Sequence, residues 1–119
     1  MESIAEAGNP NLEGLPEGPN FFDYGDAEKA MSVLKNIGFV NLDSVELSEM
    51  KWNNVRHGAM LYDVLLNGTS RTREILLNQT PEETTAIQSL MTQRYDTITD
   101  GGKRPLSMPA LVTSGQKPL

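Results

Sequence analysis

The sequence has 119 residues, of which 38% are hydrophobic and 22% are charged, and its formal net charge is −6. This composition is typical of a globular protein and does not indicate global disorder. The acidic balance argues against nucleic-acid and anionic-membrane partners, because both reward clusters of Lys and Arg. There is no cysteine, which excludes disulfides, thiolate zinc sites and a cysteine nucleophile.

Residues 1–20 are rich in proline and glycine and show no sustained hydrophobic period. We therefore expect a flexible N-terminal arm there and not a folded element. The first residues also lack a basic start followed by an apolar segment, so no signal peptide is expected. No apolar run approaches the roughly 20 residues that a membrane span needs, and we expect a cytoplasmic protein.

An aromatic cluster follows this arm. Phe21, Phe22 and Tyr24 lie within four residues of an otherwise polar segment. Such a concentration of aromatic side chains indicates a surface that docks onto something, and we interpret the three residues as a partner interface.

The next segment predicts a helix and then a strand. Asp26 suits an N-cap, a 3.6-residue apolar period runs to Ile37, and Gly38 suits a helix end from which Phe39 folds back. The apolar residues of 40–47 alternate, but the alternation changes phase. A bulge near Asp43–Ser44 would reconcile the two halves of this strand.

Three helices are expected between residues 53 and 99, the last opened by a capping box at Thr80 and Glu83. Residues 105–115 then predict a final strand, which Pro109 confines to an edge position or a bulge. The predicted fold is an α/β fragment, α+β by content. Its order is helix, strand, three-helix insertion over about 53–99 and antiparallel strand, all within one domain of residues 21–119.

Few side chains are candidates for chemistry. His57 is the only histidine and is a candidate general base. Trp52, Met60 and Tyr62 could line an apolar cavity for a small organic ligand. The competing interpretation is structural, with His57 solvated and the other three packed in the core. No group of residues has metal-ligand spacing.

The stretch FFDYGDAEKAMSVLKNIGFVNLDSVELSEMKW resembles the late part of a class I S-adenosylmethionine-dependent methyltransferase of the small-molecule type. In that family a helix of this kind precedes the sixth strand, which ends near a tryptophan, here Trp52. The tail RPLSMPALVTSGQKPL is similar to the family's seventh, antiparallel strand. The helices between resemble the insertion that many members place over the substrate.

The cofactor-binding half of that family has no counterpart in this sequence. There is no glycine-rich turn after an apolar strand, and the adjacent Gly101 and Gly102 follow a predicted helix instead. The resemblance therefore implies that this chain alone binds no cofactor and meets S-adenosylmethionine only through a partner chain. Two strands make a marginal sheet, so we expect the sheet to be completed from elsewhere.

Three hypotheses follow. The first is a subunit that complements a small-molecule, natural-product methyltransferase and supplies its substrate lid. Its partner is a methyltransferase-like chain. The second is a homo-oligomer of this chain that acts as a cofactor-free isomerase or cyclase, or that binds a small molecule near His57. The third is an inactive, truncated remnant. We favour the first.

Overall fold

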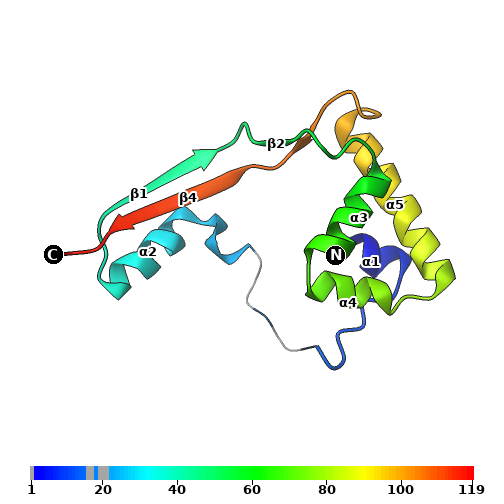
Figure 1. Ribbon diagram of the computed structural model, residues 1–119, viewed down its shortest axis with the longest axis horizontal. Helices are drawn as coiled ribbons and strands as arrows, with labels where there is room; N and C mark the ends of the chain where they lie inside the picture. The colour runs from blue at the N-terminus through cyan, green and yellow to red at the C-terminus, as the bar shows by residue number, and fades with distance from the viewer. Residues whose placement is uncertain (1, 16–17, 19–21) are drawn as a thin grey trace. The chain divides into compact units, whose positions relative to one another are not determined.

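The computed structural model describes residues 2–15, 18 and 22–119 (Figure 1). The chain forms a mixed α+β structure with two small antiparallel sheets. It divides into two compact units. We call residues 1–16 and 52–106 the helical unit, and residues 17–51 and 107–119 the strand unit. No helix in the described part of the chain is long and apolar enough to cross a membrane.

The described residues of the strand unit place an α-helix against a pair of strands. β1 (Val40–Leu47) and β4 (Ala110–Gln116) are antiparallel, and α2 (Ala27–Ile37) packs against both (Figure 1). A short 3₁₀ turn, η1 (Asp23–Gly25), precedes the helix. The expected antiparallel pairing of the two long strands is confirmed.

Both ends of α2 lie where the sequence predicts them. The Asp26 side chain accepts a hydrogen bond from the backbone N–H of Glu28 at 2.9 Å, as an N-cap does. Gly38 has φ of 108° and the backbone N–H of Phe39 donates to the Leu34 carbonyl at 3.0 Å. This left-handed turn favours glycine, because a side chain there would be strained.

The bulge in β1 lies earlier than predicted. Val40 is opposite Gln116 and Asp43 is opposite Ser114, so β1 has one extra residue between these two pairs. Asn41 takes the left-handed conformation, with φ of 51°, and its side-chain amide donates to Gln116 Oε1 at 2.7 Å. The bulge predicted near Asp43–Ser44 is present, but it lies between Val40 and Asp43, because a phase change alone does not say which residue tolerates positive φ. Asparagine does.

The helical unit is built around α3 (Gly58–Gly68), α4 (Arg71–Leu77) and α5 (Pro81–Thr99). The predicted capping box of α5 is present, with Thr80 and Glu83 each bonding the other's backbone N–H. The first of the three helices begins at Gly58, later than the expected residue 53. The buried cluster at the centre of this unit consists of Ile4, Tyr62, Ile75, Leu76, Ile87 and Met91.

Within the described residues 2–15, the N-terminal segment corrects part of the expectation of a flexible arm over 1–20. Residues Glu2–Ala7 form a helix, α1, and Ile4 is only 3% exposed within the core. Arg94 donates to Ser3 Oγ at 2.8 Å and forms an ion pair with Glu6. The Gln79 amide bonds both the N–H and the carbonyl of Asn9, at 2.7 and 2.6 Å. A helix of six residues is too short to show a hydrophobic period in the sequence. The residues that hold it, Gln79 and Arg94, lie far along the chain, so the sequence gives no local signal for it.

The C-terminal segment forms two strands where one was predicted. β3 (Leu106–Ser107) pairs with β2 (Lys51–Trp52), and β4 begins only at Ala110. Pro109 lies between β3 and β4 and has no N–H to donate to a partner strand. The proline thus interrupts this segment and does not simply bend it.

The contact between α3 and α5 gives a stability prediction. A Cβ at Gly58 would lie 2.3 Å from the Thr92 Cα, whereas a Cβ at Gly68, in the same helix, would meet nothing within 4 Å. We expect Gly58→Ala to lower the free energy of unfolding by about 1–3 kcal/mol through overpacking. The matched Gly68→Ala, at the last residue of the helix, should raise it by no more than about 0.5–1 kcal/mol, because alanine is the better helix former. Urea unfolding of both variants measures this, and equal effects would contradict the close helix contact.

Candidate functional site

His57, the candidate base, is the N-cap of α3. Its Nδ1 accepts a hydrogen bond from the Met60 backbone N–H at 3.3 Å, and the side chain is exposed. An N-cap acceptor satisfies one of the backbone donors that the first turn of a helix leaves unpaired. The contact gives His57 a structural role in starting the helix.

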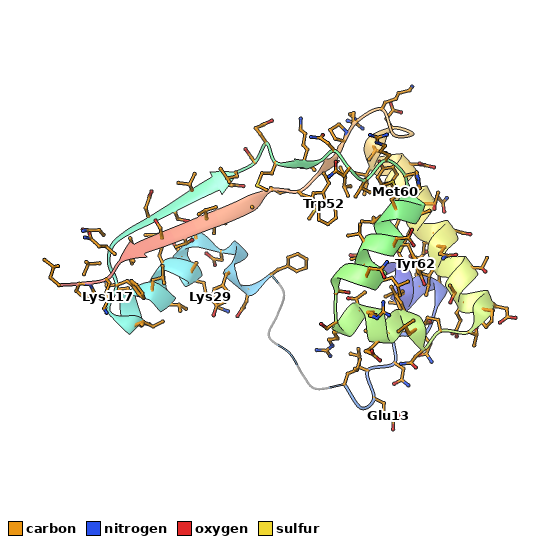
Figure 2. The ribbon with its side chains drawn as sticks, viewed as in Figure 1. Glu13, Lys29, Trp52, Met60, Tyr62 and Lys117 are labelled. Carbon is orange, nitrogen blue, oxygen red and sulfur yellow. The ribbon has the colours of Figure 1, made fainter. Side chains whose placement is uncertain are left out.

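Of the residues predicted to line an apolar cavity, Tyr62 lies in the core of the helical unit, with 6% of its surface exposed (Figure 2). Burial, and to a lesser degree the neighbouring Asp63 carboxylate, raises the pKa of the Tyr62 phenol above its ordinary value. Tyr62 is thus a packed core residue whose surroundings disfavour the phenolate. Trp52 and Met60 are half-buried.

The aromatic residues predicted as a partner interface belong to the strand unit. Phe22 and Tyr24 are both exposed, and η1 contacts α2 and β4. Phe21 lies outside the described residues.

A pocket of about 310 Å³ lies in the helical unit, at the end of α5. It is lined by residues from the segment before α3 and from the loop after α5, together with Tyr95 of α5. The lining residues are Asn53, Val55, Arg56, Tyr95, Gly102, Lys103, Arg104 and Pro105. His57, Trp52, Met60 and Tyr62 are not among them.

The walls of this pocket are fixed by buried hydrogen bonds. The Tyr95 hydroxyl donates to the Val55 carbonyl at 2.8 Å, and both residues are buried. The Thr99 hydroxyl donates to the Tyr95 carbonyl at 2.7 Å and accepts from the Gly102 N–H at 3.1 Å. These bonds join the segment before α3, the last turns of α5 and the loop that follows.

The pocket is strongly basic for an acidic chain. Arg56, Lys103 and Arg104 line it, and no carboxylate does. This group cannot be recognised in the sequence, because Arg56 is far along the chain from the other two. The only local signal is the Lys103–Arg104 pair directly after a helix end. Within the described residues, no group of three or more His, Cys, Asp or Glu could hold a metal ion.

A second candidate surface is the face of the β1–β4 pair that bears Val45 and Val112. These two side chains lie directly opposite each other and are 48% and 52% exposed. Leu47, two residues along β1, is exposed on the same face. On the other face Ser44 and Thr113 are half-buried and their hydroxyls lie 3.2 Å apart. We call the surface of Val45, Leu47 and Val112 the open face.

The capping role of His57 is testable. We expect His57→Ala to lower the free energy of unfolding by about 1 kcal/mol, the usual cost of losing an N-cap acceptor. His57→Asn keeps a capping side chain and should stay close to the wild type. Thermal unfolding of both variants measures this, and an equal loss in the two would show that the imidazole is needed for some other contact.

Burial of Tyr62 predicts a loss of stability at alkaline pH. The phenol loses its proton more readily in the unfolded state, since its folded pKa is raised. Stability should therefore fall as pH rises above about 10, the ordinary tyrosine value. Tyr62→Phe should show a smaller fall between about pH 9 and pH 11 in urea unfolding. Parallel curves for the two proteins would contradict the raised pKa.

Comparison with protein-family models, with curated proteins and with solved structures finds no match to this chain.

Proposed function

We propose that this chain is a methyltransferase-like subunit. It complements a small-molecule S-adenosylmethionine-dependent methyltransferase, joins a partner chain through the strand unit, and supplies helices that cover the substrate. The proposal starts from the resemblance in the sequence of residues 21–52 and 104–119 to the last part of that enzyme family. The order of elements supports it, with α2 before β1, helices next, and then β4 antiparallel to β1.

The observation that carries the proposal is the lack of a buried core among the described residues of the strand unit. Among its described residues only Ala30 is buried, at 7% exposure, whereas the helical unit holds the whole buried cluster around Ile75 and Ile87. Most of the large exposed hydrophobic side chains belong to the strand unit. An isolated pair of strands is marginally stable, and further strands on an apolar face provide the missing burial.

The open face offers such a surface. Val45 and Val112 form a directly opposed pair with about half of each side chain in water. Burying a valine side chain fully contributes about 1.5–3 kcal/mol. A partner that covers this pair and Leu47 therefore gains apolar burial that the described residues leave unused.

The edge of β4 is the more open of the two strand edges. β1 carries Asp43, Glu46 and the bulge at Asn41, which are features that discourage another strand from pairing. β4 runs from Ala110 to Gln116 without a charged residue or a bulge in its own chain. We infer that a partner strand adds to β4, where backbone hydrogen bonds supply affinity.

This function places the cofactor on the partner. The purified chain should then show no saturable binding of S-adenosylmethionine, and binding should appear with the partner. The methyl acceptor is a small organic molecule, of the natural-product kind that the resemblance implies.

The experiment tests whether the open face is the partner interface. We expect tagged wild-type chain, purified from its own cells, to retain a stoichiometric partner that binds S-adenosylmethionine and transfers its methyl group. Val112→Glu should abolish this, because a carboxylate buried against an apolar partner is costly. The matched control is Val64→Glu, which makes the same change at an exposed valine on α3.

Two results would contradict the proposal. One is a co-purified chain that neither binds S-adenosylmethionine nor supports methyl transfer. The other is equal retention of the partner by Val112→Glu and the wild type. Loss of the partner from both glutamate variants would show a general effect of charge, and the open face would then not be the interface.

A further inference from the structure

We propose that the basic pocket of the helical unit binds the phosphate group of a small phosphorylated organic molecule. The pocket belongs entirely to the helical unit, so this inference does not depend on the partner proposed for the strand unit.

The pocket carries a concentration of positive charge. Three of the eight lining residues are Arg56, Lys103 and Arg104, in a chain with a net charge of −6. Among the described residues, neither arginine forms an ion pair with a carboxylate. Lys103 pairs only with Asp100, at 3.9 Å, and both side chains are largely exposed. Such a pair contributes little, so nearly all of the positive charge is available to a ligand.

Compensation of the helix dipole does not account for this group. Lys103 and Arg104 follow the C-terminus of α5, where cations are favourable, and an Arg104 nitrogen lies 3.5 Å from the Ile98 carbonyl. Arg56 belongs to a different segment, which precedes α3. The cations of the pocket therefore come from two separate segments of the chain. A site that binds an anion from more than one side needs such an arrangement.

The frame that carries these cations is already ordered. Two hydrogen bonds to Thr99 hold the loop after α5. The Gly102 N–H donates to Thr99 Oγ1 at 3.1 Å, and the Arg104 N–H donates to the Thr99 carbonyl at 2.9 Å. Gly102 has φ of 85°, and a Cβ there would lie 3.6 Å from the Arg56 carbonyl oxygen. The two cationic segments are therefore close together, and hydrogen bonds to Tyr95 and Thr99 hold each of them to α5, which lowers the entropy that ligand binding must overcome.

Size and chemistry select the ligand class. A volume of about 310 Å³ is near the lower end for small-molecule sites and exceeds what a lone phosphate ion fills. Pro105, which is exposed, offers apolar surface to an organic group. Two guanidinium groups, each able to donate two parallel hydrogen bonds, and a lysine ammonium suit the several oxygens of a phosphate dianion. A carboxylate has only two oxygens and is bound by a single guanidinium group.

The test is a titration of the full chain with phenyl phosphate. Binding is measured by calorimetry and by the chemical shift of the Gly102 backbone amide in NMR spectra. Saturable binding with a shift at Gly102 is expected. Arg56→Gln should weaken binding about tenfold or more, the effect of losing one charge-assisted hydrogen bond. Arg71→Gln is the matched control, because it removes the same charge from α4 outside the pocket.

Three outcomes would overturn the inference. Phenyl phosphate could fail to bind the wild type, or Arg71→Gln could weaken it as much as Arg56→Gln, which would indicate diffuse charge attraction. Tighter binding of benzoate than of phenyl phosphate would assign the pocket to carboxylates instead. None of these results depends on methyl transfer, so failure here and failure of the proposed function are distinguishable.

Discussion

The described residues of the strand unit bury very little apolar surface among themselves. α2 covers one face of the β1–β4 pair, and the opposite face presents Val45 and Val112 to water. Hydrophobic burial is the dominant favourable term in folding, and only Ala30 is buried among the described residues of this unit. We therefore propose that this arrangement is stabilised as part of a larger sheet. The proposed function follows from this constraint together with the resemblance to methyltransferases.

The helical unit differs because its helices enclose a core. Ile75 and Ile87 are almost fully buried, and the N-terminal helix contributes Ile4 to the same cluster. Hydrogen bonds from Gln79 and Arg94 hold that N-terminal segment in place. A folded frame of this kind can carry a binding pocket. The proposed anion site therefore lies in this unit, and the proposed protein interface lies in the other.

The parts of the fold that the sequence predicts are those with local signals. Asp26, Gly38 and Thr80 mark helix ends within a few residues of the helices they cap, and all three helix ends are confirmed. The helix at residues 2–7 was missed because its stability comes from distant contacts of Ile4. The basic pocket was missed for the same reason, since Arg56 and Arg104 come together only in three dimensions.

Amide hydrogen exchange on the purified full chain, at a concentration where it is monomeric, tests the central claim most directly. Protection reports the free energy of local opening, residue by residue. The account predicts weak protection along β1 and β4 and strong protection at Ile87 and Met91 in α5. Equal protection of the strands and of α5 in the monomer would show that the strand pair is stable alone and needs no partner.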